Sequence, residues 1–196
     1  MKVAIVNFPG TNCERDTKYA FDKLGCETQI IWHKETDINA DLIVLPGGFS
    51  HGDYLRTAAI AKFSPVMKAV LAHAARGGYI LGICNGFQML LELGLLAGAM
   101  NKNINLSFIS KFHYLRVVSN DNKFLHCCDK SEILNIPIAH GEGNYYAPAD
   151  TLKSLYDEDC VLLKYCDENG ADLNPNGSVD AIAGICDKNK KIFGLM

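Results

Sequence analysis

The stretch that decides the fold is Tyr79–Gln88, which reads YILGICNGFQ. Its first half is apolar and typical of a buried strand, and a helix-period run of apolar residues follows from Gly86 onward. Between them lies Gly82–Gly86, which reads GICNG and has the nucleophile-elbow form G-x-S-x-G with cysteine in place of serine. The pattern therefore predicts a tight strand-to-helix turn that presents the thiol of Cys84.

The spacing of this motif suits a cysteine nucleophile. Side chains two positions before and after Cys84 would collide in so tight a turn, so glycine is needed at Gly82 and Gly86, and strained backbone is expected at the cysteine. The positive end of the following helix points at the sulfur, so we expect a lowered thiol pKa. The backbone N–H of Asn85 can then stabilise a developing oxyanion.

Two other interpretations of the motif stay open at this point. Cysteine is often a small buried hydrophobe, in which case Cys84 has only a packing role. Glycine-rich turns from strand to helix also bind phosphates. The G-x-C-x-G pattern alone does not choose among a nucleophile, a core residue and a phosphate site.

Composition limits the classes of function. The chain has 196 residues, 48% of them hydrophobic, and a net charge of −3. This length predicts one domain with its own core. The small negative charge gives no electrostatic reason to expect binding to nucleic acid or to an anionic membrane. No apolar stretch approaches the length of a membrane span.

The eight cysteines are scattered and contain no C-x-x-C pair. Several lie in apolar runs, as reduced core cysteines do, and the N-terminal apolar run is too short for a signal peptide. We therefore expect a cytoplasmic protein with reduced thiols. His126, Cys127 and Cys128 are adjacent but lack the ligand spacing of a zinc site, so no metal is expected.

The order of the predicted elements indicates an α/β fold. In the first half, strands are expected at Lys2–Phe8, Thr28–Trp32 and Leu42–Leu45, with helices ending near Leu24 and spanning Pro65–Ala75. Strands that alternate with helices imply a parallel sheet, and ligands then lie beyond the carboxyl ends of its strands.

After Gly98 the apolar residues alternate with polar ones, which predicts further, antiparallel strands. These are expected at Asn103–Ser110, Phe112–Ser119, Phe124–Cys128, Ile136–Ala139, Val161–Cys166, Val179–Cys186 and Ile192–Met196. We predict one three-layer α/β domain over residues 1–196, with a mixed, mostly parallel sheet and helices on both faces.

The third predicted strand opens into a glycine-rich loop, Pro46–Arg56. We interpret Gly48 as a second oxyanion donor, because glycine lets a backbone N–H approach a ligand closely; an ordinary glycine-rich turn is the alternative. His51 and Asp53 face either the substrate or water. Arg56 is the candidate contact to a partner protein, and a solvated arginine is the alternative.

Four stretches of the chain carry a resemblance to a known family. They read FPGTNCE at Phe8–Glu14, LPGGFSHGDYLR at Leu45–Arg56, GICNGFQ at Gly82–Gln88 and AHGEGNYY at Ala139–Tyr146. The chain resembles the class I (triad) glutamine amidotransferases, and among them the glutaminase subunits of phosphoribosylformylglycinamidine synthase. The resemblance extends from the first strand to the last residue and implies the flavodoxin-like fold of that class.

The resemblance also implies a reaction. Cys84 would attack the side-chain amide of glutamine, and the N–H groups of Gly48 and Asn85 would hold the oxyanion. Ammonia would leave, and water would hydrolyse the glutamyl thioester to glutamate. The glutamine-binding residues implied by the resemblance are Gly47, Gln88, His140 and Gly141.

Partners follow from the same resemblance. The ammonia would pass, inside a complex, to a large synthetase subunit that uses ATP and Mg²⁺. That subunit converts formylglycinamide ribonucleotide to formylglycinamidine ribonucleotide in purine biosynthesis. Some members need a third, small subunit. No cofactor is expected in this chain itself.

One part of the family pattern has no match in the chain. The family completes its triad with a His-x-Glu pair directly after the final strand, whereas the chain reads IFGLM at 192–196, where that segment should begin. We therefore expect the C-terminal catalytic segment to be missing from residues 1–196. His140–Glu142 is itself a His-x-Glu and gives an alternative base, since triads are recognised by geometry.

Two further functions stay open. A chain without the triad histidine and glutamate would be a non-catalytic, glutamine-binding or docking subunit. A cysteine hydrolase of the α/β-hydrolase or thioesterase kind shares the elbow, and would need its base and acid within this chain.

Overall fold

The computed structural model describes all residues from Met1 to Met196 and divides into two compact units. The first unit is Met1–Leu95 and the second is Leu96–Met196. The first unit contains parallel strands and the second contains antiparallel strands. Whether residues 1–196 form a single glutamine amidotransferase domain stays a prediction.

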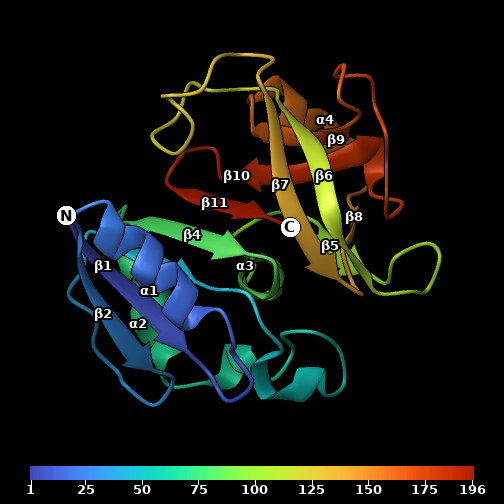
Figure 1. The fold of residues 1–196 in the computed structure, drawn as a ribbon. Coiled ribbons are helices and arrows are strands. Elements are labelled where there is room, and N and C mark those ends of the chain that lie inside the picture. Colours follow the sequence, from blue (N-terminus) through green and yellow to red (C-terminus); the bar gives the residue numbers. More distant parts are fainter. The chain divides into compact units, whose positions relative to one another are not determined.

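The first unit is a parallel α/β arrangement. Its strands are β1 (Lys2–Asn7), β2 (Glu27–Trp32), β3 (Leu42–Leu45) and β4 (Tyr79–Ile83). Its helices are α1 (Glu14–Lys23), α2 (Val66–Ala75) and α3 (Asn85–Glu92), with short 3-10 turns at Ser50–Asp53 and Ala61–Phe63. The strands follow the order β2-β1-β3-β4, and every neighbouring pair is parallel. Figure 1 shows α1 in front of this sheet and α2 behind it.

The core of the first unit explains why these segments form strands. All four residues of β3 and four of the six residues of β1 are buried, as expected for strands covered by helices on both faces. On α2, Val66 and Val70 are fully buried and fix the helix against the sheet. The parallel strands and the crossover helices predicted from the sequence are confirmed.

The second unit is mainly antiparallel. Its strands are β5 (Ala99–Asn101), β6 (Ile109–Val117), β7 (Ile133–His140), β8 (Asn144–Tyr146), β9 (Val161–Cys166), β10 (Ile182–Cys186) and β11 (Ile192–Leu195). Five of them follow the order β11-β10-β9-β6-β7, and β5 pairs with β8. In Figure 1, β6 and β7 lie side by side along their length, with Ile109 opposite His140.

The structure corrects three expectations for the second unit. The strand predicted at Asn103–Ser110 begins only at Ile109, because residues 103–108 form a turn in which Nδ2 of Asn103 donates to the Ser107 carbonyl at 2.8 Å. Phe124–Cys128 is a series of turns instead of a strand, because the Asn122 side chain accepts hydrogen bonds from the N–H groups of Phe124 and Leu125 and bends the chain. The helix α4 (Ala149–Asp157) was not predicted. Leu155 is its one buried residue, and the helix follows Pro148 with Asp150 in its first turn, a helix-start signal that the sequence analysis did not use.

Candidate active site

Cys84 lies at the predicted turn, between the carboxyl end of β4 and the first residue of α3. Its backbone has φ 49° and ψ −106°, a sparsely populated conformation for a residue with a side chain. The strain predicted from the elbow motif is therefore present. It accompanies the sharp change from strand to helix at this residue.

The two elbow glycines are required by close backbone contacts. A Cβ at Gly82 would lie 2.7 Å from the carbonyl oxygen of Gly86, which is the collision predicted from the motif. A Cβ at Gly86 would lie 1.8 Å from the carbonyl oxygen of Leu45, at the end of β3. The second glycine thus lets α3 approach β3, the strand from which the glycine-rich loop leaves.

The glycine-rich loop lies beside the nucleophile. A Cβ at Gly47 would be 3.7 Å from the Cβ of Cys84 and 3.4 Å from the Sγ of Cys13. Gly48 has φ 144°, and a Cβ there would be 2.8 Å from the backbone nitrogen of Asn12. The structure therefore brings Gly47 next to Cys84, while the donor role of Gly48 stays a prediction.

Cys13 is a site residue that the sequence analysis did not single out. Its backbone N–H donates to the Gly47 carbonyl at 3.3 Å, and its thiol lies near the same glycine. This backbone hydrogen bond connects the segment around Cys13 to the glycine-rich loop. The sequence could have indicated Cys13, because this residue lies within FPGTNCE, one of the four stretches that carry the family resemblance.

The protonation of Cys84 differs from the expectation. Burial raises the pKa of its thiol to about 12, and the hydrogen bond from the Asn85 backbone N–H offsets only part of this increase. The proximity of Cys13 and Asp53 raises the pKa further. The prediction that the helix N-terminus lowers the pKa is wrong, because loss of solvation outweighs the helix dipole.

This raised pKa predicts slow alkylation of Cys84 by a small, undirected reagent. With a pKa of about 12, roughly one thiol in 10⁵ is ionised at pH 7, so the labelling rate of Cys84 by iodoacetamide should rise about tenfold per pH unit. Peptide mass spectrometry of the chain of residues 1–196 would measure this rate, with the exposed Cys127 as internal comparison. A rate that levels off between pH 7 and 8 would contradict the raised pKa.

The side-chain amides of Asn85 and Gln88 form a buried hydrogen bond in the first unit. Asn85 is 1% exposed and Gln88 4% exposed, and Nδ2 of Asn85 donates to Oε1 of Gln88 at 2.9 Å. Oδ1 of Asn85 accepts from the backbone N–H of Ser50 at 3.1 Å. Gln88 is thus held one turn along α3 from the nucleophile, where the sequence analysis placed it, and its contact with substrate stays a prediction.

Arg56 is engaged within the chain. Its Nε and one terminal nitrogen each donate to the Glu92 carboxylate at 2.7 Å, and Lys62 lies 3.5 Å from the same carboxylate. The arginine beside Glu92 lowers the pKa of that carboxyl group. The Arg56 side chain is still 60% exposed, so its role as a partner contact stays a prediction.

His140 and Gly141 belong to the second unit. The ring of His140 is buried, its Nδ1 lies 3.2 Å from Oδ1 of Asn103, and its Nε2 has no hydrogen-bond partner. Oδ1 of Asn103 also accepts from the Gly143 N–H at 3.0 Å, and Nδ2 donates to the His140 carbonyl at 2.8 Å. Asn103 thus fixes the segment that the resemblance assigns to glutamine.

Burial lowers the pKa of His140 to about 4, below its ordinary value of 6.5. Between these values the unfolded chain binds a proton that the folded chain does not, so stability should fall as pH falls through this window. The loss should approach about 3 kcal/mol between pH 7 and pH 4. Urea denaturation between pH 7 and pH 4 measures the free energy of unfolding. This free energy should depend less steeply on pH in His140→Gln than in the unchanged chain. Equal slopes would contradict this prediction.

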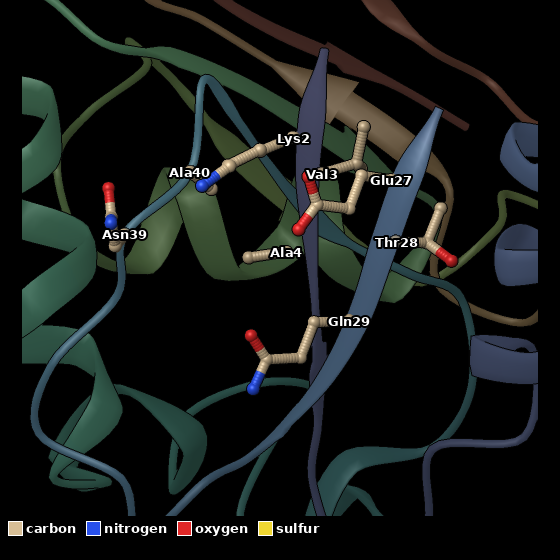
Figure 2. Close-up of a pocket in the computed structure, with 8 residues that line it drawn as sticks. All are labelled: Lys2, Val3, Ala4, Glu27, Thr28, Gln29, Asn39 and Ala40. Atoms are coloured by element: carbon tan, nitrogen blue, oxygen red, sulfur yellow. The ribbon is translucent and has the colours of Figure 1, made fainter. Parts of the chain in front are cut away.

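One further hollow of the first unit lies away from the elbow. Its volume is about 180 Å³, smaller than typical ligand pockets. Figure 2 shows it lined by the first residues of β1 and β2 together with Asn39 and Ala40. Because β1 and β4 run in the same direction, this is the amino edge of the sheet, whereas Cys84 follows a carboxyl end. The hollow therefore does not belong to the candidate site.

The whole chain, residues 1–196, matches the family of CobB/CobQ-like glutamine amidotransferase domains. The chain belongs to this family. Among similar proteins, the phosphoribosylformylglycinamidine synthase subunit PurQ of Campylobacter jejuni is 68% identical, over all of this chain and 85% of that protein. The protein of the same name from Sulfurimonas denitrificans is 61% identical, over all of this chain and 88% of that protein.

Solved structures agree with this membership of the glutamine amidotransferases. A chain in the structure of PurLQS from Thermotoga maritima is 38% identical and superposes with a TM-score of 0.89, over all of this chain and 85% of that chain. A second glutamine amidotransferase from the same organism is 18% identical, has a TM-score of 0.63 over 99% of this chain and 74% of its own, and shares the fold. The predicted class I amidotransferase-like α/β fold is confirmed. No helix of the chain has the length and apolar character needed to cross a membrane.

Proposed function

We propose that this chain is the glutaminase subunit of a phosphoribosylformylglycinamidine synthase, which hydrolyses glutamine and supplies ammonia for purine biosynthesis. The observation that carries the proposal is the backbone of Cys84, held at φ 49° between β4 and α3 with Gly47 beside it. This is the geometry of a nucleophile elbow. Membership of the glutamine amidotransferase family and the names of the relatives support the same activity.

In the proposed reaction, the Cys84 sulfur forms a bond to the side-chain amide carbon of glutamine. The carbonyl oxygen becomes an oxyanion, which accepts hydrogen bonds from the N–H groups of Gly48 and Asn85. The C–N bond then breaks, and the nitrogen leaves as ammonia after taking a proton. Water attacks the resulting thioester, which releases glutamate and restores the thiol of Cys84.

The thiol must lose its proton before it attacks. Because burial raises the pKa of Cys84 to about 12, this step needs a general base. The resemblance assigns the base to a His-x-Glu pair that has no match in residues 1–196. Within the chain, His140 is a weak base because burial lowers its pKa to about 4. We assign His140 and Gly141, together with Gly47 and Gln88, to binding glutamine.

We further propose that the chain works in a cytoplasmic complex. Its partner would be a large synthetase subunit that binds ATP, Mg²⁺ and formylglycinamide ribonucleotide, with a third, small subunit in some members. The exposed guanidinium of Arg56, held in place by Glu92, is a candidate contact with that partner. We expect no metal or cofactor in this chain itself, because the proposed steps use a thiol, a general base and backbone donors.

A second candidate function is favoured by the raised pKa of the thiol. A protonated Cys84 beside an intact glycine loop would bind glutamine without hydrolysing it, so the chain would act as a glutamine-binding subunit. Calorimetric titration with glutamine, together with a glutamate assay on the same sample, separates the two functions. Binding without glutamate formation in the assembled complex would favour this second function.

The proposed function is tested by labelling with a chloroketone analogue of glutamine. Because binding directs this electrophile to the site, Cys84 should label before the other seven cysteines, and excess glutamine should slow the reaction. Peptide mass spectrometry identifies the labelled residue. The exposed Cys127 should show no protection by glutamine. Even labelling of all eight cysteines would contradict a glutamine site at the elbow.

A further inference from the structure

The side chain of Asn85 connects the nucleophile helix to the glycine-rich loop within the first unit. Its backbone N–H is the proposed oxyanion donor, and its side-chain amide makes separate contacts. Oδ1 accepts from the Ser50 N–H at 3.1 Å, and Nδ2 lies 2.9 Å from Oε1 of Gln88 and 3.5 Å from Oδ1 of Asp53. We propose that this amide is a positioning group that sets both the glycine loop and Gln88 relative to Cys84. The inference rests on the glutaminase function proposed above.

The loop needs such a group because its backbone is strained. His51, Gly52 and Asp53 follow one another at φ 54°, 69° and 53°. Each non-glycine residue in this left-handed region costs about 1–2 kcal/mol, so contacts elsewhere must hold the loop in place. The N–H of Ser50, directly before this run, is buried and is satisfied by Asn85.

The hydrogen bonds of His51 also hold the glycine-rich loop, but they connect it to segments other than α3. The His51 N–H donates to the Pro9 carbonyl at 2.6 Å, and its ring Nε2 lies 3.3 Å from the Ser64 hydroxyl. Those contacts fix the loop to the surrounding segments of the first unit. The hydrogen bond from Ser50 fixes it to α3 itself, one residue after the nucleophile, and so sets the distance between Gly48 and Cys84.

The same amide orients Gln88. An asparagine side chain has a carbonyl oxygen that accepts hydrogen bonds and an NH₂ group that donates two. In Asn85, the carbonyl oxygen accepts from the loop, and the NH₂ group donates to Gln88 and Asp53. This hydrogen bond fixes the side-chain carbonyl of Gln88, and the orientation of the Gln88 NH₂ group is fixed with it. Loss of the Asn85 amide should therefore affect both glutamine affinity and the oxyanion step.

The test is Asn85→Leu in the full-length protein assembled with its synthetase subunit. Leucine has a similar size and keeps the backbone N–H but removes every side-chain hydrogen bond of Asn85. We expect kcat with glutamine to fall about 10- to 100-fold, KM for glutamine to rise several-fold, and ammonia-dependent synthesis to stay unchanged. Hydrogen–deuterium exchange should also show faster exchange of the Ser50 amide.

Ser50→Ala is the matched control. The Ser50 hydroxyl is buried without a hydrogen-bond partner, and its removal leaves the N–H bonded to Asn85. This variant should keep the kcat, KM and thermal stability of the unchanged protein. If Asn85→Leu does not fold, Asn85→Asp replaces it in the test. The carboxylate still accepts a hydrogen bond from the Ser50 N–H, so we expect slow exchange of the Ser50 amide and a smaller loss of kcat than in Asn85→Leu. The carboxylate cannot donate to Gln88, so we expect a raised KM for glutamine.

The outcomes separate this inference from the proposed function. If the unchanged complex does not use glutamine, the glutaminase function itself fails. If the unchanged complex uses glutamine and Asn85→Leu keeps at least half of that activity, the positioning role is wrong. The positioning role is also wrong if the Ser50 amide of Asn85→Leu exchanges as slowly as in the unchanged protein. For Asn85→Asp, a KM for glutamine equal to that of the unchanged protein would overturn the positioning role.

Discussion

Replacing Cys84 with alanine should abolish glutamine-dependent synthesis by the assembled complex and leave ammonia-dependent synthesis intact. Loss of a covalent nucleophile typically lowers the rate on the order of 10⁴- to 10⁶-fold. Alanine removes the sulfur while keeping a Cβ, so the strained backbone at the elbow and the fold around it should persist. Steady-state assays with glutamine and with ammonium chloride, on the same preparation, measure both activities.

Comparison of the two activities identifies the role of Cys84. Loss of both would mean that Cys84 is a structural residue needed for assembly. Retention of glutamine-dependent synthesis would exclude a thioester on this cysteine. Cys128→Ala is a suitable control, because Cys128 is half-buried in the second unit and belongs to none of the proposed site segments. It should keep both activities.

Gly86→Ala should destabilise the chain more than any other single-methyl addition at the elbow. The new Cβ would lie 1.8 Å from the carbonyl oxygen of Leu45 and 2.8 Å from its Cβ, and both of these atoms are part of the buried strand β3. Relief would require α3 and β3 to separate, so we expect a loss of more than about 4 kcal/mol in the free energy of unfolding. Chemical denaturation followed by circular dichroism gives this quantity.

Gly77→Ala provides the comparison for that effect. Gly77 has φ 74°, and a Cβ there would meet no atom within 4 Å. Its cost is therefore limited to the left-handed backbone, about 1–2 kcal/mol. If Gly86→Ala costs no more than Gly77→Ala, the close approach of α3 to β3 is not a constraint on the fold.

Much of the first unit could be predicted from the sequence because its signals are local. The apolar runs that became β1 and β3 are short and bounded by turn residues, and α2 follows a helical period. The elbow motif predicted the backbone strain at Cys84, since glycine spacing and turn geometry are directly linked. In the second unit, local polar contacts of Asn122 outweighed the apolar pattern of Phe124–Cys128.

The sequence by itself determined the order of strands and helices, the position of Cys84 at a strand-to-helix turn, and the family resemblance. Each of these depends on residues that are neighbours along the chain. The tertiary structure decided which backbone atoms the elbow glycines face, and it reversed the expected pKa shift of Cys84, since burial depends on the surrounding elements. It also decided that the amide of Asn85 meets the N–H of Ser50, 35 positions earlier. Such contacts follow from packing, which no local pattern specifies.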